Sequence, residues 1–115
     1  MLRRVRGMHG EGDIALSAVS AVELTHGIYR AGTDANRARR RTFVEGVFRD
    51  LVVYPLTLEI ARLAGRIEGE QAALGNTIAF EDLLIGSTAL QVGFDVVTSN
   101  LRHFRTIPGL NVLTI

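Results

Sequence analysis

The stretch "FEDLLIGSTALQVGFDVVTSN", residues 80–100, decides the fold class, because a helix pattern changes into a strand pattern within it. Phe80–Val92 has apolar residues at helical spacing, and Gly93 is a typical helix stop. The run that follows, Asp95–Ser99, is short, rich in β-branched residues and typical of a buried strand. The stretch therefore predicts a helix that leads directly into a strand.

The same alternation continues on both sides of this stretch. We expect further helices at residues 20–31, at residues 34–48 with Asp34 as the cap, and at residues 57–74. Short apolar runs predict buried strands at residues 14–17, 51–55 and 111–115, and the tail of another helix is expected at residues 2–9. Alternating strands and helices predict an α/β fold, with a largely parallel sheet flanked by helices, in a single domain over residues 1–115. In such folds the site lies at the carboxyl ends of the strands.

The composition is that of an ordinary globular chain, with 47% hydrophobic and 22% charged residues. No apolar stretch reaches the roughly 20 residues that a membrane span needs, and the N-terminal residues have no signal-peptide pattern. The absence of cysteine fits a reducing compartment. We therefore expect a cytoplasmic protein with no membrane partner.

Positive charge is concentrated locally although the net charge is only +1. The run "RARRR" spans Arg37–Arg41. Two interpretations of this run remain open, a solvated helix face and a patch that contacts phosphate groups.

Glu23 lies within the largely apolar stretch "ALSAVSAVELTHGIYRAG", residues 15–32. Ser20 and Glu23 have the S-x-x-E spacing of a capping box, in which the glutamate only stabilises the start of the helix. However, the residues around Glu23 are apolar, so this helix start is poorly solvated. A role in a metal site is the alternative.

Asp82 leads a small apolar helix face made of Ile85, Gly86 and Ala89. A carboxylate there is costly to bury unless backbone amides, a partner or a cation satisfies it. Its neighbour Glu81 is expected to point elsewhere, as a surface residue. Two carboxylates at one crevice could hold Mg²⁺ or Mn²⁺, and a metal-activated water could then attack a phosphodiester.

Three stretches in this order resemble the PIN-domain family, in particular the VapC ribonuclease toxins of bacterial and archaeal toxin–antitoxin pairs. They are "ALSAVSAVELTHGIYRA", "FEDLLIGSTALQVGFDVVTSN" and "NLRHFRTIPGLNVL". The similarity covers nearly the whole chain. It implies cleavage of RNA that depends on Mg²⁺ or Mn²⁺ and uses acids at the carboxyl ends of a parallel sheet. It also implies a cognate antitoxin as partner and a homodimer.

By this resemblance, Glu23 and Asp82 match two metal-binding acids of the family. Asn100 falls where members carry Asp or Asn, and it joins the two acids as an expected catalytic residue. His103 falls where several members carry another Asp. The residues expected to bind the substrate are Ser20, Thr98, Arg102 and His103.

The chain departs from the family pattern at its start. PIN domains begin with an apolar strand that ends in Asp followed by Thr or Ser, and nothing here matches that strand. The chain therefore looks like a PIN domain without about its first 20–30 residues, the size of a strand-plus-helix unit. In the family's sheet this strand is central, so the strands at residues 14–17 and 95–99 are expected to lose their partner.

Two functions remain open after this comparison. The first is a metal-dependent ribonuclease of toxin type, impaired by the loss of the first strand and its Asp, which cleaves RNA poorly or not at all. The second is a non-catalytic remnant that binds an antitoxin or itself. An unrelated nucleotide-binding module is disfavoured, because neither G-x-G-x-x-G nor G-x-x-x-x-G-K-[ST] occurs.

Overall fold

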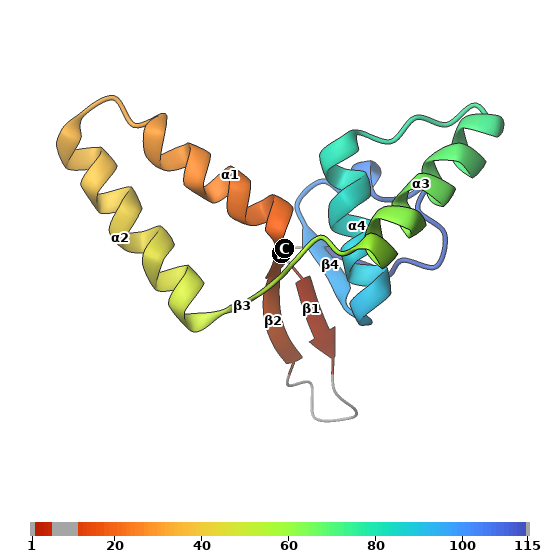
Figure 1. Ribbon diagram of the computed structural model, residues 1–115, viewed down its shortest axis with the longest axis horizontal. Coiled ribbons are helices and arrows are strands. Elements are labelled where there is room, and N and C mark those ends of the chain that lie inside the picture. The colour runs from red at the N-terminus through yellow and green to blue at the C-terminus, as the bar shows by residue number, and fades with distance from the viewer. Residues whose placement is uncertain (1, 6–11, 115) are drawn as a thin grey trace.

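The computed structural model describes residues 2–5 and 12–114 of the chain (Figure 1). Helices and strands alternate along most of it, as the sequence predicts. In chain order the elements are β1 (Leu2–Val5), β2 (Gly12–Ser17), α1 (Ala18–Tyr29), α2 (Asp34–Asp50), β3 (Val52–Tyr54), α3 (Leu58–Ala73), α4 (Phe80–Val92), β4 (Asp95–Thr98), the 3-10 turn η2 (Leu101–His103) and β5 (Val112–Thr114).

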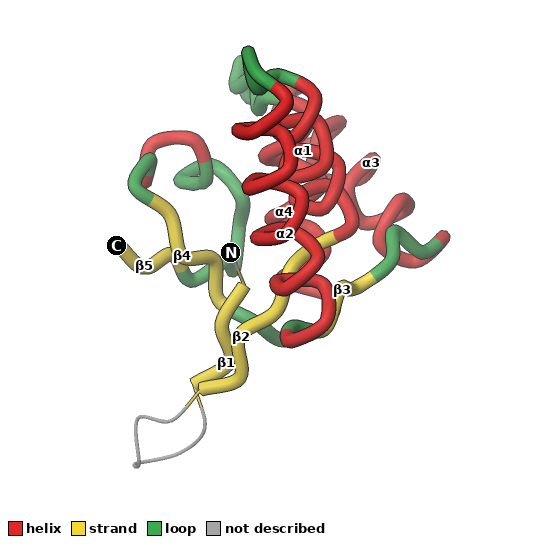
Figure 2. Tube along the Cα trace, turned by 90° about the vertical axis from the view of Figure 1, so that its left-hand side faces the viewer, coloured by secondary structure: helices red, strands yellow, loops and turns green. Residues whose placement is uncertain are grey.

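The strands form one five-stranded sheet in the order β3-β2-β1-β4-β5. The outer pairs, β2 with β3 and β4 with β5, are parallel. The central strand β1 is antiparallel to both of its neighbours. Figure 2 shows β1 alongside β2, with β4 and β5 further along the same group of strands. The sheet is therefore mixed. The expectation of a largely parallel sheet holds only for the two outer pairs of strands.

The beginning of the chain is where the sequence-based prediction was wrong. Leu2–Val5 is a strand and not the tail of a helix, while residues 6–9 of that prediction lie outside the described residues. Leu2 pairs with Ala15 of β2 and with Val96 of β4. The strands at residues 14–17 and 95–99 were expected to lack a partner, but β1 lies between them. The physical reason is that two buried strand edges leave N–H and C=O groups unpaired, and any extended segment that reaches them satisfies these groups.

The helices lie in two groups (Figure 1). Helix α4 contacts α3, β2 and β4, and it packs its buried residues into the core. Helices α1 and α2 form a hairpin, the helical arm, that extends away from the sheet. The hydrophobic core therefore lies between the sheet and α4, and its buried members are Leu2, Ala15, Ala64, Ile67, Ile78, Leu83, Ile85, Ala89, Phe94, Val96, Phe104 and Ile107.

The edge strands are less buried than the sequence suggests. Leu16, Val53, Val97 and Val112 all lie in strands, as predicted, but only Leu16 is fully buried. The other three are half-buried: Val53 and Val112 lie on the edge strands β3 and β5, and Val97 lies on β4, which is inside the sheet.

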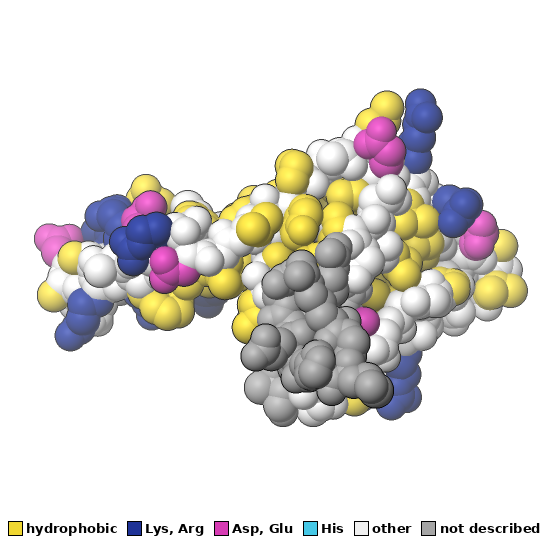
Figure 3. All heavy atoms as spheres, turned by 90° about the horizontal axis from the view of Figure 1, so that it is seen from below, with side chains coloured by type: hydrophobic (Ala, Val, Ile, Leu, Met, Phe, Trp, Pro, Cys, Tyr) yellow, Lys and Arg dark blue, Asp and Glu magenta, His cyan; other side chains and the backbone are white. Residues whose placement is uncertain are grey.

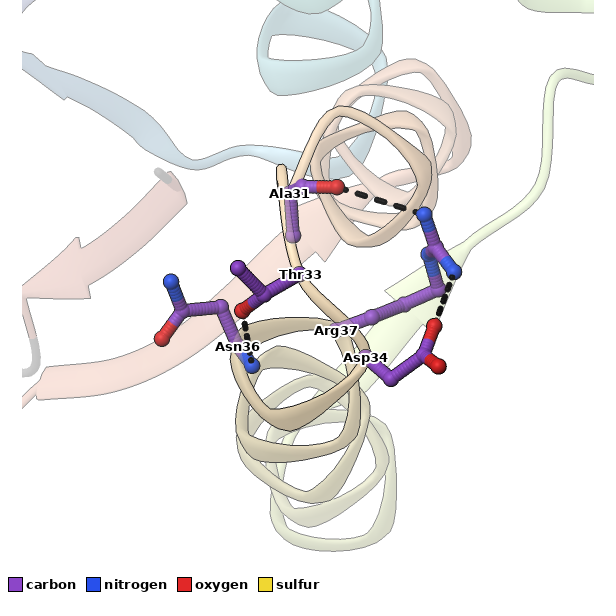
Figure 4. A network of polar contacts seen from close by, with 5 residues as sticks. All are labelled: Ala31, Thr33, Asp34, Asn36 and Arg37. Atoms are coloured by element: carbon purple, nitrogen blue, oxygen red, sulfur yellow. Dashed lines mark hydrogen bonds and ion pairs between the residues drawn. The ribbon is translucent and has the colours of Figure 1, made fainter.

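Two arginines of the "RARRR" run tie the helical arm together. Thr33, and not Asp34, caps α2 by accepting a hydrogen bond from the Asn36 amide, at 3.1 Å. Arg37 pairs with Asp34 and donates to the Ala31 carbonyl at the end of α1 (Figure 4). Arg40 donates to another carbonyl of α1, as described below.

Arginine and acidic side chains are interspersed along the arm in the view from below (Figure 3). Residues 38–41 of the run are exposed and Arg37 is half-buried, so both interpretations of the run stay open.

We expect Leu2→Ala to lower the free energy of unfolding by about 2–4 kcal/mol, because Leu2 is fully buried in the central strand. A matched control is Leu58→Ala, since Leu58 is 63% exposed and its truncation should cost less than about 0.5 kcal/mol. Urea denaturation followed by circular dichroism measures both values. Equal, small effects of the two substitutions would contradict the central position of β1.

Candidate active site

Ser17, the last residue of β2, determines how the following helix begins. Its side chain is completely buried, and its hydroxyl accepts a hydrogen bond from the Ser20 amide, at 3.1 Å. Ser17 is therefore the N-cap of α1. Ser20 is not the cap, so the capping box of Ser20 and Glu23 predicted as one alternative does not form. Glu23 belongs to the second turn of α1, where no backbone N–H needs it.

Asp82 lies in the first turn of α4, whose N-cap residue Ala79 makes no side-chain cap hydrogen bond. An acid in this turn is favoured by the helix dipole. Only 19% of the Asp82 side chain is exposed, and its Oδ2 atom lies 3.3 Å from His103 Nδ1 on η2. The 3-10 turn therefore brings His103 to the acid that opens α4.

Asn100 follows β4 directly and lies at the start of η2. Its backbone amide donates to the Thr98 hydroxyl at 3.0 Å, a short-range turn that fixes the path of the chain after the strand. The Asn100 side chain is exposed and has no partner among the described residues. Its amide group is thus available to a ligand.

One pocket of about 220 Å³ joins these residues. Because β2 and β4 point the same way, the elements that follow them meet at one edge of the sheet. The pocket brings together six of the seven residues expected to be catalytic or substrate-binding, while Arg102 is exposed on η2 and does not line it. The polar residues that line it are Ser20, Glu23, Asp82, Thr98, Asn100 and His103.

Glu81 is the residue that the sequence interpretation missed. It is exposed, as expected, but it does not point away from the site, because it lines a second pocket together with Glu23. Neighbouring helix residues differ by about 100° in direction, so Glu81 and Asp82 diverge from the same turn. Glu23 faces both of them, and the S-x-x-E pattern gave no sign of this.

The acids perturb one another. A side-chain hydrogen bond with Glu81 raises the pKa of Glu23, and burial and the charges of Glu81 and Asp82 act in the same direction. Burial raises the pKa of Asp82, His103 partly offsets this effect, and Glu81 adds to it. The anionic forms of both carboxylates are therefore destabilised, which a bound cation would relieve.

Within residues 2–5 and 12–114, no three His, Asp or Glu side chains are grouped closely enough to hold a metal ion by themselves. Glu23 and Asp82 nevertheless fit one mode of Mg²⁺ binding, in which one or two carboxylates, several waters and the substrate's phosphates complete the shell. The donor set consists of oxygen atoms, which Mg²⁺ and Mn²⁺ prefer.

The cap assignment leads to a stability prediction. Ser17→Ala should lower the free energy of unfolding by about 1–2 kcal/mol, because it removes the cap and leaves the half-buried Ser20 amide without its partner. Glu23→Gln should not lower it. The measurement is urea denaturation of both variants, and a loss in Glu23→Gln that equals the loss in Ser17→Ala would restore the capping role of Glu23.

The family model and the sequence relatives that this chain matches agree with one another. The PIN domain model matches residues 2–110. Ribonuclease VapC1 of Rickettsia felis is 30% identical over 104 residues, which cover 90% of this chain and 78% of that protein. The tRNA(fMet)-specific endonuclease VapC of Salmonella typhimurium is 33% identical over 94 residues, which cover 82% of this chain and 71% of that protein.

Solved structures agree with these sequence relatives. DNA-bound VapBC from Salmonella typhimurium aligns with a TM-score of 0.77 and 31% identity, over 85% of this chain and 72% of that chain. Other structures of this fold are toxin–antitoxin complexes of the VapBC family and a FitAB complex with DNA. In the described part of this chain, no helix combines the length and apolarity required to cross a membrane.

Proposed function

Because the chain belongs to the PIN-domain family and its relatives are VapC ribonucleases, we propose that it is a divalent-metal-dependent ribonuclease of toxin–antitoxin type. The observation that carries this proposal is the pocket in which Glu23 and Asp82 face each other beside Asn100 and His103. These side chains come from three separate elements that meet only at the carboxyl edge of the sheet.

In the proposed site, the carboxylates of Glu23 and Asp82 would hold the ion. When bound, Mg²⁺ or Mn²⁺ supplies positive charge against the phosphate and lowers the pKa of water for attack on phosphorus. Because the described residues place only two carboxylates in this pocket, ion binding depends on the phosphate of the RNA, and we expect slow cleavage.

The other residues of the pocket position the acids and the substrate. His103 Nδ1 faces Asp82 Oδ2 and fixes the orientation of that carboxylate. Ser20 Oγ accepts a hydrogen bond from Ser17 Oγ at 3.2 Å, so its own proton is free for donation to a phosphate oxygen. The Asn100 amide is a second neutral donor for the same phosphate.

An RNA cleavage assay tests the proposal. The purified chain is incubated with labelled single-stranded RNA in the presence of Mn²⁺, Mg²⁺ or EDTA. We expect cutting with either ion, no cutting in EDTA, and none with Glu23→Gln. The control is Glu59→Gln, an exposed acid in the first turn of α3, which should cut like the parent chain. Cutting that survives Glu23→Gln would reject the proposed site.

A second candidate function is a non-catalytic chain that binds an antitoxin. The observation that favours it is the central strand, because β1 brings Leu2 to the site edge and the described residues offer no third metal-binding acid there. This alternative would be selected if the chain binds an antitoxin but shows no cutting that depends on metal and on Glu23.

A cognate antitoxin and a second copy of the chain are proposed partners in either case. Support comes from the VapBC complexes among the structural relatives and from an apolar pocket of about 580 Å³ on the helical arm. Val22 and Tyr29, 68% and 65% exposed, line that pocket, which also reaches Phe48 of α2. Val22→Asp should weaken binding of the antitoxin in a pull-down without changing the fold.

A further inference from the structure

A second pocket, of about 580 Å³, adjoins the candidate active site. It shares Ser20 and Glu23 with the active-site pocket of about 220 Å³, so the two pockets are neighbours along the same face of α1. From there it continues to His26 and Arg30 at the end of the helix. None of the site residues discussed above accounts for this extension.

Charge changes sign along this pocket. Glu23 and Glu81 lie at the end nearest the active site, and His26 and Arg30 lie at the other end. Residues 23, 26 and 30 fall on one helix face, because their directions differ by no more than about 60°. Glu23 and Arg30 are separated by about 10 Å of helix rise, which places the cation beyond the acids.

Arg30 has no side-chain partner among the described residues, and it is exposed. A cation at the end of a helix also complements the helix dipole, an effect that concerns stability alone. A second arginine reaches α1 near this face, however. Arg40 of α2 donates a hydrogen bond to the Gly27 carbonyl at 2.7 Å. Gly27 lies within about 40° of the direction of Glu23. Arg40 does not line the pocket itself, but its guanidinium group lies against the carbonyl of Gly27, the residue that follows His26 of the pocket lining.

We propose that this pocket binds the sugar–phosphate backbone of the RNA next to the bond that is cut, with Arg30 and Arg40 contacting a neighbouring phosphate. The inference rests on the proposed function, because the scissile phosphate is assumed to lie at Glu23 and Asp82. Arginine suits this task, since its planar fork of N–H donors matches a phosphate group. The acids at one end and the arginines at the other would set the direction in which the strand crosses α1.

The test measures RNA binding separately from cutting. In the Asp82→Asn background, the affinity for a labelled single-stranded RNA is measured by fluorescence anisotropy over a range of salt concentrations. Arg30→Gln with Arg40→Gln should weaken binding about tenfold or more. It should also reduce the slope of log affinity against log salt by about 1.4, which corresponds to two lost phosphate contacts.

Two further variants keep this test interpretable. Arg30→Gln alone, which breaks no hydrogen bond of the arm, should reduce the slope by about 0.7. The charge-matched control is Arg62→Gln with Arg66→Gln on α3, which should leave both affinity and slope unchanged. An unchanged slope in the Arg30 variants, or equal losses in the α3 control, would overturn the inference.

The cutting assay distinguishes this inference from the proposed function. In the chain with an intact Asp82, Arg30→Gln should raise KM several-fold and leave kcat unchanged. Metal-dependent cutting with an unchanged KM would reject the role of Arg30 and retain the ribonuclease. Polyglutamate serves as an acidic-peptide probe, and its loss of binding in Arg30→Gln without any change in RNA binding would assign the pocket to a protein partner and reject the inference.

Discussion

Asp82→Asn should reduce the rate of RNA cutting by about 100-fold or more. At the same time, it should raise the thermal stability of the chain at neutral pH. The loss of activity is expected because one of the two carboxylates proposed to hold the metal becomes neutral, and the metal contributes several kcal/mol to the stabilisation of the reacting phosphate. The gain in stability is expected because burial disfavours the charged form of Asp82.

The pH dependence of this gain has a definite sign. The folded-state pKa of Asp82 lies above its ordinary value of 3.8, so the folded chain binds the proton more tightly than the unfolded chain. Stability therefore falls as the pH rises from that value through the folded pKa. The advantage of Asp82→Asn should be full above this window and should disappear below it, where Asp82 is protonated in both states.

Thermal denaturation at several pH values measures the change in stability, and the cutting assay measures the loss of activity. Asp50→Asn is the control, since Asp50 is 70% exposed at the end of α2 and should change neither property. Loss of activity with loss of stability at pH 7 would mean that Asp82 holds the fold together, contrary to its assignment as a metal ligand.

Gly86→Val should destabilise the fold by about 3 kcal/mol or more. A Cβ atom at Gly86 would lie 2.5 Å from Ile107 Cδ1 and 3.2 Å from Leu110 Cδ2. Ile107 is only 2% exposed, so its side chain can yield only by shifting within the core. The branched side chain must therefore push the segment after η2 away from α4, with the cost that overpacking brings.

Gly65→Val and Gly65→Ala are the matched controls for this effect. No atom lies within 4 Å of a Cβ built at Gly65, which is exposed on α3. There, Gly65→Ala should stabilise the chain by up to about 1 kcal/mol through helix propensity. Urea denaturation gives all three values. If the Gly86→Val variant is as stable as the Gly65→Val variant, then the segment after η2 does not pack on α4.

Gly86→Val should also reduce RNA cutting, because the same segment follows His103. A displacement of about 1 Å at an active site can cost around 100-fold in rate. If the fold weakens and the cutting rate per folded molecule stays unchanged, then His103 contributes nothing to the site.

Local patterns predicted most of the elements. The helix that starts at Phe80 and the strand that starts at Asp95 were predicted with their observed first residues, because helical spacing, a glycine stop and a β-branched run agree there. The convergence of Glu23, Asp82 and Asn100 was also expected, since each lies at or just beyond a strand end or in the first turn of a helix, whereas His103 was expected at the site only from the family resemblance. Their roles in metal binding and catalysis stay predictions.

Two features could not be predicted from local patterns. β1 carries "LRRV", whose composition favours neither state, and its conformation is set by pairing with Ala15 and Val96, which lie further along the chain. The position of Glu81 depends on the angle between α1 and α4. That angle follows from packing and has no counterpart in the sequence of either helix.

The central position of β1 has a consequence for the order of folding. The pairs β2–β3 and β4–β5 touch each other in the sheet only through this strand. Pairing residue 2 with residue 96 closes a loop that includes most of the chain, which is entropically slow to form. The two halves of the sheet are thus expected to form first and to join last. The amides of β1 that bond to β4 should then exchange their hydrogens at the rate at which this final step reverses.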